Sequence, residues 1–289
     1  MGAARPQVLR RTDCRSGDVR RSFMMTGAAG GLGRAMVAGL IQHGYRGIAV
    51  DRDIDALRSL ASEVDQPDRL VTIAANLASQ EGIDRVLSDS IGTFGQVDIL
   101  VNNAALGPNL IKPNYLASPA VVDEVSPQLI RQFFEVNAIA PMLLAIGLIP
   151  SMRRKGWGRI VNVTTSLPSM LRRGFVPYGG SKAALEAHSA IMAQDLEGTG
   201  ITVNVLIPGG AADTAMVPAE TGLKRAALIQ PRQMVSPLLW LIEGEANGRR
   251  VIAGKWDGQA GKAEDHPAVR PVAWSLGDDV TIMPENEDA

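Results

Sequence analysis

Short, nearly continuous apolar runs alternate along the chain with longer segments of helical character. The apolar runs, each of five to eight residues, lie at 22–26, 47–51, 70–75, 97–102, 158–165, 201–207 and 249–254. The helical segments lie near 32–43, 54–64, 79–92, 126–152, 179–197 and 231–243. Apolar strands separated by helices predict a parallel sheet that is covered on both faces. We therefore expect an α/β fold, a doubly wound parallel sheet of about seven strands in one domain over residues 22–258.

Both ends of the chain depart from this alternation. Residues 1–21 carry six arginines against two aspartates, a surplus of four positive charges, and almost no apolar periodicity. We expect a disordered basic tail there. It lacks the apolar core of a secretory signal, whereas an organelle transit peptide and an extension from an upstream start both stay open. Residues 259–289, rich in Pro, Asp and Glu, predict a loosely ordered second tail.

Composition argues against several classes of protein. The net charge of -1 gives no electrostatic reason to expect nucleic acid or an anionic membrane as a partner. With Cys14 as the only cysteine and three scattered histidines, we expect no disulfide framework and no metal site. The apolar stretch 138–152 is too short to span a membrane and contains two prolines, so it predicts a buried helix. A cytoplasmic setting fits this composition.

A glycine-rich turn, TGAAGGLGRAM, follows the first apolar run. Gly27, Gly31 and Gly33 there allow a tight turn and let backbone N–H groups approach a pyrophosphate. The helix that follows points its positive N-terminus at the same charge. The context of strand, turn and helix therefore predicts a dinucleotide site.

Asp51 ends the second apolar run, eighteen residues after Gly33. A carboxylate at that place accepts from the ribose hydroxyls and repels a 2′-phosphate, which favours NAD over NADP. Two alternatives remain: Asp51 caps the helix 54–64, or the neighbouring Arg52 binds a 2′-phosphate. We expect NAD, because no basic residue stands inside the glycine turn.

The stretch VPYGGSKAALEAHSA places Tyr178 and Lys182 four residues apart at the start of a helix. One interpretation is structural, since residues at i and i+4 share a face of any helix. The other is chemical: a phenol beside an ammonium has a lowered pKa and can exchange protons near neutral pH. The spacing alone does not decide between them.

Six motifs occur together in one order: the glycine turn, NNAA at 102–105, Asn137 in FEVNAIAPML, GRIVNVTTS at 158–166, Tyr178-x-x-x-Lys182 and NVLIPGG at 204–210. In this order and spacing the chain resembles the short-chain dehydrogenase/reductase family over residues 22–255. The resemblance implies a seven-stranded Rossmann sheet, NAD(P) at the carboxyl ends of the strands, and hydride transfer between nicotinamide and an alcohol or carbonyl.

The resemblance also implies roles for individual residues. Tyr178 is the acid/base, Lys182 holds the nicotinamide ribose and lowers the phenol pKa, and Asn137 sits in a helix distortion that seats a water. Thr165 takes the place of the usual serine, with Ser166 as its rival. Cofactor contacts are implied at Gly27, Gly31, Leu32, Gly33, Asp51, Asn76, Leu77, Asn103, Ala104, Tyr178, Lys182, Pro208, Gly209 and Thr214.

Three features depart from the family pattern. Ala105 stands where the family has glycine, and Asn76 stands where an aspartate usually meets the adenine amino group. We expect cofactor binding to survive both changes. The third is the end of the domain, where Trp256-Asp257-Gly258 replaces the usual finish and reshapes the pocket edge or a subunit contact.

The long connection 106–125 and the residues before Tyr178 indicate the substrate. So long a link between elements is typical of a functional loop, and Leu167, Met170, Leu171 and Phe175 predict a mainly apolar site. Arg172 and Arg173 either bind an acidic substrate group or form a solvated turn, which is the more common case.

We expect a secondary alcohol or ketone with an apolar body as substrate. We also expect a homo-oligomer, either a tetramer, as family resemblance implies, or a dimer. A non-catalytic dinucleotide-binding sensor or scaffold is the alternative. An epimerase or dehydratase is a third reading, although such relatives usually carry a larger C-terminal domain.

Overall fold

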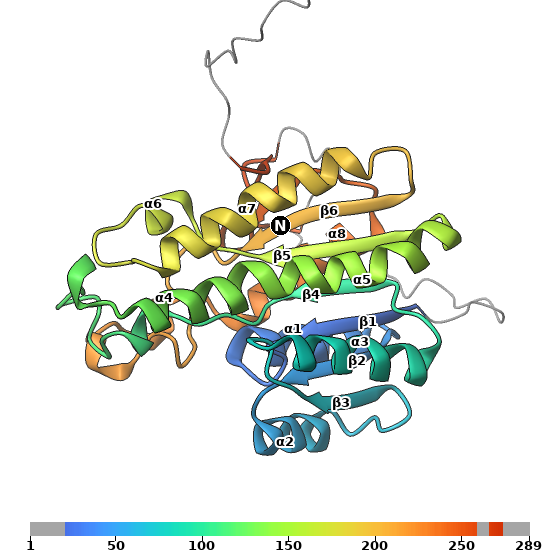
Figure 1. Cartoon of the computed structure of the whole chain (residues 1–289), viewed down its shortest axis with the longest axis horizontal. Coiled ribbons are helices and arrows are strands. Elements are labelled where there is room, and N and C mark those ends of the chain that lie inside the picture. Colours follow the sequence, from blue (N-terminus) through green and yellow to red (C-terminus); the bar gives the residue numbers. More distant parts are fainter. Residues whose placement is uncertain (1–20, 259–265, 274–289) are drawn as a thin grey trace, which may run out of the picture.

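One sheet forms the centre of the fold. The computed structural model describes residues 21–258 and 266–273. Within them, eight strands join in one sheet (Figure 1). The strands are Ser22–Thr26 (β1), Arg46–Asp51 (β2), Leu70–Ala74 (β3), Ile99–Asn102 (β4), Gly158–Val163 (β5), Ile201–Ile207 (β6), Arg249–Ile252 (β7) and Val269–Pro271 (β8). Their order is β3-β2-β1-β4-β5-β6-β7-β8, and every pair is parallel except β7 with β8.

Helices connect the parallel strands. They are Gly31–Gln42 (α1), Ile54–Val64 (α2), Gln80–Phe94 (α3), Pro127–Phe134 (α4), Ala140–Lys155 (α5), Leu167–Met170 (α6), Tyr178–Asp195 (α7) and Val235–Glu243 (α8). A π-helical segment, Glu135–Ile139 (η3), joins α4 to α5. Alternating strands and helices confirm the doubly wound, Rossmann-like α/β class that the apolar pattern predicts.

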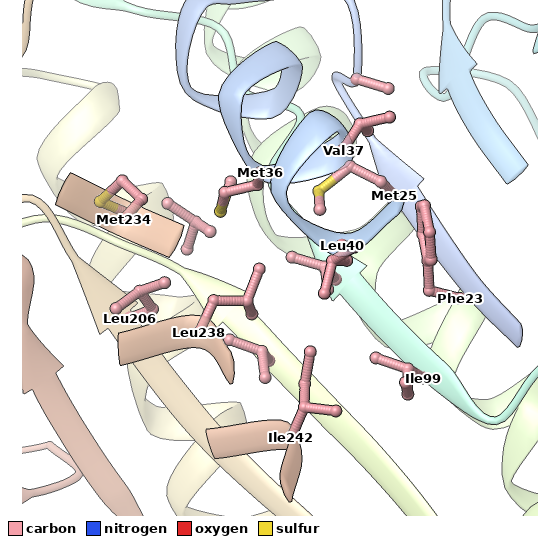
Figure 2. Close-up of a cluster of buried hydrophobic side chains, with 14 of the residues drawn as sticks. Phe23, Met25, Met36, Val37, Leu40, Ile99, Leu206, Met234, Leu238 and Ile242 are labelled. Carbon is pink, nitrogen blue, oxygen red and sulfur yellow. The ribbon is translucent and has the colours of Figure 1, made fainter. Parts of the chain in front are cut away.

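Two apolar cores sandwich the sheet. The first lies beneath α1, α2 and α8, and the second lies beneath α3, α5 and α7. In Figure 2, Phe23 of β1 faces Leu40 of α1, and Met36 of α1 lies near Leu238 of α8. Because both faces are buried, the strands are apolar along most of their length, and the burial of β1 and β6 is complete.

Polar residues set where the helices begin. The side chain of Asp53 accepts from the N–H groups of Asp55 and Ala56 at the start of α2. Ser79 caps α3 and Ser126 caps α4 in the same way, and Pro127 follows Ser126 in the first turn. These caps satisfy amide groups that a helix N-terminus leaves without intrahelical partners.

The apolar stretch 138–152 lies in a long helical unit, Pro127–Lys155, that includes α4, η3 and α5. Within the described residues this unit alone is long and apolar enough, with a mean hydropathy of 1.7, to cross a membrane by length and composition. The core helix of a soluble protein passes the same test. Leu144, Ala145 and Leu148 of α5 are buried against the sheet, whereas Ile146 is exposed.

The carboxyl-terminal residues differ from the sequence-based expectation. Residues 266–273 were expected in a loosely ordered tail, but 269–271 form β8, which pairs with β7. The short apolar stretch around Val269 and Val272 gives little signal in the sequence, although both side chains are buried once β7 is present. The basic tail at 1–20 and the stretches 259–265 and 274–289 lie outside the described residues.

Candidate active site

The glycine turn lies at the carboxyl end of β1, where the strand order reverses between β1 and β4. Figure 1 shows that the loops after β4, β5 and β6 gather at this same edge, with α4 and α6. In open parallel sheets, ligands bind in the crevice at such a point. The cofactor residues expected from the sequence therefore lie at the edge where a dinucleotide crevice forms.

Hydrogen bonds tie the glycine turn to the end of β4. The hydroxyl of Thr26 accepts from the N–H groups of Asn103 and Ala104 at 3.0 and 3.1 Å. The side-chain amide of Asn103 donates in return to the carbonyl of Gly27 at 2.9 Å. These hydrogen bonds hold the backbone of Gly27 beside Ala104 and so fix the position of the turn relative to the end of β4.

The three glycines of the motif leave no room for a side chain. Gly27 has φ +61°, and a Cβ there would lie 2.6 Å from the Cα of Ala104. A Cβ on Gly33 would overlap the carbonyl oxygen of Gly27, and one on Gly31 would lie 2.7 Å from Cγ2 of Thr214. The close approach of Thr214 also shows that the loop after β6 covers the glycine turn.

Asp51 closes the turn from the side of β2. Its carboxylate accepts from the N–H of Ala29 at 3.1 Å and from the N–H of Arg52 at 2.8 Å. The cap of α2 is Asp53, so the alternative of Asp51 as a helix cap is wrong. Arg52 is exposed at the end of β2. Asp51 therefore lies next to the backbone of the glycine turn.

Asn76 and Leu77 follow β3, further from the strand crossing. The side-chain oxygen of Asn76 accepts from the N–H of Ala78 at 3.1 Å, and Leu77 is buried in the second apolar core. Leu32 lies in the first turn of α1 and packs against the first core. These contacts show a local structural role for each residue, and their cofactor contacts stay a prediction.

Pro208 and Gly209 follow β6 and begin the loop that leads to Thr214. The carbonyl of Pro208 accepts from the N–H of Gly254 at 2.9 Å. Gly209 has φ +93°, and a Cβ there would lie 2.5 Å from Cγ2 of Ile252. Glycine is the residue that adopts this backbone without strain. The turn thus directs the chain back across the crevice toward Thr214.

The helix α7 carries Tyr178 in its first turn and Lys182 one turn further on. Lys182 is 2% exposed, and its ammonium donates to the carbonyl of Val163 at the end of β5, at 2.7 Å. Burial lowers the pKa of Lys182 to about 7, while the nearby carboxylate of Glu186 raises it. Lys182 is thus held at the inner end of the crevice.

Tyr178 differs from the expected behaviour in its pKa. Burial raises the pKa of Tyr178 to about 12, a hydrogen bond from Thr165 lowers it, and the charge of Tyr115 raises it. The sequence-based expectation was a pKa lowered by Lys182. The pKa of Tyr178 is raised instead of lowered, because the phenol is 8% exposed and packs among aromatic rings, where its charged form is disfavoured.

The structure brings Thr165, rather than Ser166, to Tyr178. The hydroxyl of Thr165 lies close enough to the phenol to lower the pKa of Tyr178. The hydroxyl of Ser166 lies 2.9 Å from the hydroxyl of Ser169, in the first turn of α6. Thr164 points the other way and donates to Glu186 at 2.7 Å. Of these three neighbouring hydroxyls, Thr165 is the one that lowers the pKa of Tyr178.

Asn137 lies in the π-helical segment η3, which agrees with the helix distortion implied for it. Its side-chain oxygen accepts from the N–H of Leu106 at 2.7 Å, and its amide donates to the carbonyl of Leu106 at 3.1 Å. The amide also donates to the hydroxyl of Ser181, at 3.0 Å. Asn137 thereby joins the loop after β4 to the helix that carries Lys182.

Aromatic and aliphatic side chains surround the phenol. Tyr178 packs edge-on against Phe175, and Phe175 packs edge-on against Tyr115, with ring centroids 6.0 and 5.6 Å apart. The partly buried side chains packed against this cluster are Leu106, Ile111, Leu116, Leu129 and Met216. Three of them belong to the long connection 106–125. The walls near Tyr178 are mainly apolar.

One residue near this cluster differs from its expected placement. Leu171, expected to line the site, is 78% exposed, because α6 ends at Met170 and the following turn points outward. The guanidinium of Arg172 lies 5.4 Å over the ring of Phe175. Met170 and Phe175 are buried as expected.

Comparison with known proteins decides the family. The model of the short chain dehydrogenase family matches residues 21–222. The chain belongs to the short-chain dehydrogenase family. Members of this family are oxidoreductases that act on alcohols, and their Rossmann fold binds NAD(P).

Individual relatives cover most of the chain. It is 32% identical over 209 residues to 1-deoxy-11-beta-hydroxypentalenate dehydrogenase of Streptomyces exfoliatus, covering 71% of this chain and 72% of that protein. It is 26% identical over 212 residues to 3beta-hydroxysteroid dehydrogenase 2 of Eggerthella lenta, covering 71% and 78%.

A solved short-chain dehydrogenase structure shows the same architecture. L-sorbose reductase from Gluconobacter frateurii, complexed with NADPH and L-sorbose, is 28% identical with a TM-score of 0.60, and the match covers 67% of this chain and 70% of that one.

The sequence analysis missed two charged residues beside the site. Glu186 of α7 is 0% exposed and forms an ion pair with Arg250 of β7. Glu186 lies one helical turn after Lys182, a spacing that is visible in the sequence. Nothing in the sequence around Arg250 indicates that it faces Glu186, because 64 residues separate the two positions.

Proposed function

We propose that the protein is an NAD-dependent dehydrogenase or reductase that transfers a hydride between nicotinamide and a secondary alcohol or ketone with an apolar body. One observation carries this proposal: the hydroxyl of Thr165 lies beside the phenol of Tyr178 and lowers its pKa, with Lys182 one turn further along α7. A phenol held by a hydroxyl donor is the arrangement needed to move a proton to or from a substrate oxygen.

The fit of a dinucleotide is supported by the space around the glycine turn. Gly27, Gly31 and Gly33 carry no side chain, and a Cβ at any of them would clash with neighbouring atoms. Without side chains, the backbone N–H groups of the turn can approach a pyrophosphate. Asp51 lies beside it, with its carboxylate 3.1 Å from the N–H of Ala29. When bound, NAD supplies the hydride acceptor in oxidation and the hydride donor in reduction.

The residues of this chain would then handle the proton and the geometry. Thr165 orients the substrate oxygen, and Tyr178 takes the hydroxyl proton during oxidation or returns it during reduction. Lys182 holds the ribose and places a positive charge beneath the phenol as it ionises. Asn137 and Ser181 keep the start of α7 against the loop after β4.

The substrate class is supported by the walls of the site and by relatives. Tyr115, Phe175 and Met216 present apolar surface near Tyr178, which favours a substrate with an apolar body. Two relatives are named as dehydrogenases of a hydroxypentalenate and a hydroxysteroid.

The choice of NAD rests on Asp51, which would meet a 2′-phosphate with a negative charge. One structural relative, L-sorbose reductase, was solved with NADPH. The ratio of the Kd values for NAD and NADP tests the assignment to NAD.

Self-association and a cytoplasmic setting are part of the same proposal. Ile146 of α5 and Ile191 of α7 are 56% and 54% exposed, and both helices border a shallow groove on the outside of the molecule. Such apolar surface supports a homo-oligomer. Light scattering on the purified protein measures its mass directly, and a strict monomer would contradict this part of the proposal.

The test of the function is a screen of secondary alcohols with purified protein and NAD, followed by absorbance of the reduced nicotinamide. The matched control is Tyr178→Phe, which removes only the phenol oxygen. We expect turnover by the unmodified protein, and a loss of about 10² to 10⁴ in the variant, with unchanged NAD binding. Substantial turnover by Tyr178→Phe on the same alcohol would contradict the role of the phenol.

A further inference from the structure

A buried charged pair lies directly behind the threonine turn. Glu186 of α7 is 0% exposed, and the side chain of Arg250 on β7 is 11% exposed. Arg250 Nε lies 3.3 Å from Glu186 Oε1. This contact is an attraction between charges without hydrogen-bond alignment. Removing two charges from water costs free energy, so a buried ion pair needs further hydrogen bonds or a functional role to compensate.

Each partner of the pair makes a second contact with the turn after β5. Glu186 Oε2 accepts from the hydroxyl of Thr164 at 2.7 Å. Arg250 Nη2 donates to the carbonyl oxygen of Thr165, also at 2.7 Å. The pair therefore binds two consecutive residues, Thr164 through its side chain and Thr165 through its backbone carbonyl.

These two hydrogen bonds fix residues that lie outside the strand, because β5 ends at Val163, just before Thr164. The N–H of Thr164 still donates to Leu206 of β6, at 3.2 Å. Arg250 then holds the carbonyl of Thr165, whose side chain reaches Tyr178. A rotation of the Thr165 peptide would carry that side chain away from the phenol.

The pair also receives a contact from the chain beyond β8. The N–H of Ala273 donates to Glu186 Oε1 at 3.1 Å. Ala273 adopts φ +62°, a left-handed conformation that costs energy for alanine. One carboxylate thus joins the threonine turn, β7 and the residues after β8.

We propose that Glu186 and Arg250 are positioning residues, which hold Thr165 against Tyr178 so that loss of either one slows the chemical step more than it weakens cofactor binding. This inference rests on the proposed oxidoreductase function. Neither residue touches the substrate, and both act through the threonine turn.

The first test replaces Arg250 with Met, which keeps the aliphatic stem and removes the guanidinium. We expect kcat to fall on the order of 10- to 100-fold, because a displacement of about 1 Å at a reacting group has this effect. The Kd for NADH, measured by fluorescence, should change by less than about twofold, since the glycine turn is not involved. Arg250→Lys should recover part of kcat, because its ammonium reaches one of the two acceptors.

Arg249→Met is the matched control, because successive residues of a strand point to opposite faces. We expect it to keep the kcat of the unmodified protein. All rates are compared at a temperature where circular dichroism shows each variant to be folded. If Arg250→Met does not fold, Glu186→Gln provides the second test, since glutamine keeps the size and the hydrogen-bonding capacity of the side chain.

The double variant Glu186→Gln/Arg250→Met tests the pair as a unit. We expect its kcat and its Tm to lie close to those of the worse single variant. A folded Arg250→Met or Glu186→Gln with unchanged kcat would overturn the inference while leaving the proposed function in place. If the unmodified protein turns over no alcohol, the proposed function fails. In that case the Tm values still test the pair: additive Tm changes would overturn the coupling of Glu186 with Arg250, whereas non-additive changes would support it.

Discussion

The glycine turn after β1 and the threonine turn after β5 lie at the same edge of the sheet, yet they are held in different ways. Close backbone packing and uncharged hydrogen bonds hold the first: Gly27 lies against Ala104, and Asn103 donates to the carbonyl of Gly27. Buried charges hold the second, through Glu186 and Arg250. The first turn depends on the absence of side chains at its glycines, whereas the second depends on two charged side chains, one from helix α7 and one from strand β7.

The difference separates binding from chemistry. Changes to the glycine turn should affect cofactor affinity and the stability of the fold, because the turn is part of the close packing around β1. Changes near the threonine turn should affect the rate first. The following predictions test this separation.

The largest effect is expected at Thr165. Thr165→Val keeps the branched shape and removes the hydroxyl that meets Tyr178, so turnover should fall on the order of 10²-fold, with NADH affinity nearly unchanged. Ser166→Ala is the control, because its hydroxyl faces Ser169. Steady-state kinetics and NADH titration measure both variants. The opposite ranking would transfer the role to Ser166.

On the glycine side, Gly33→Ala should damage binding and stability together. The added Cβ would overlap the carbonyl oxygen of Gly27, and such overpacking costs about 1–3 kcal/mol. Gly30→Ala is the control, because a Cβ there would meet the same oxygen at 3.4 Å, an ordinary contact. Urea unfolding and NADH titration measure the two variants. Equal behaviour of the two would show that the turn tolerates a side chain.

A smaller change is expected at Asp51. Asp51→Ala removes the negative charge that a 2′-phosphate would meet, so the preference for NAD over NADP should drop roughly tenfold, the factor that about 1.4 kcal/mol represents. The ratio of the two cofactor Kd values is the measurement. An unmodified protein that binds both cofactors equally would contradict the assignment of Asp51.

The last effect is the pH dependence of stability that Lys182 contributes. Its pKa is lowered from 10.5 to about 7, so between these values the unfolded chain binds a proton that the folded chain lacks. Stability should therefore rise with pH in this window, by at most about 1.4 kcal/mol per unit from this group. Above pH 10 the raised pKa of Tyr178 acts in the opposite direction.

The measurement is the free energy of unfolding of the unmodified protein and of Lys182→Met between pH 7.5 and 9.5. The slope with pH should be smaller in Lys182→Met. Equal slopes in both proteins would show that burial does not shift the pKa of Lys182.

The two turns also explain how much the sequence could predict. The strands, the glycine turn and the carboxyl-edge position of Asp51 follow from residue types at short spacing, and the structure places them as predicted. Tyr178 and Lys182 are visible for the same reason, since both lie on α7. The raised pKa of Tyr178 was not predictable, because it depends on Phe175 and Tyr115 packing around the phenol.

Long-range pairing is the part that the sequence could not indicate. Arg250 meets Glu186 only because β7 and α7 are brought together by the sheet. Ala273 reaches the same carboxylate because β8 turns back along β7. Neither contact leaves a periodic pattern in the sequence, so the sequence predicted a loosely ordered tail that includes residues 266–273.

The antiparallel strand β8 has a consequence for how copies of this chain could associate. It occupies the hydrogen-bonding edge of β7, with Val251 opposite Val269 and Arg249 opposite Pro271. A second molecule therefore finds no open β7 edge on which to continue the sheet. β8 itself is a poor template for strand addition, since it is three residues long and Pro271 has no N–H to donate. The blocked β7 edge thus keeps this side of the molecule from growing into open-ended aggregates by strand addition.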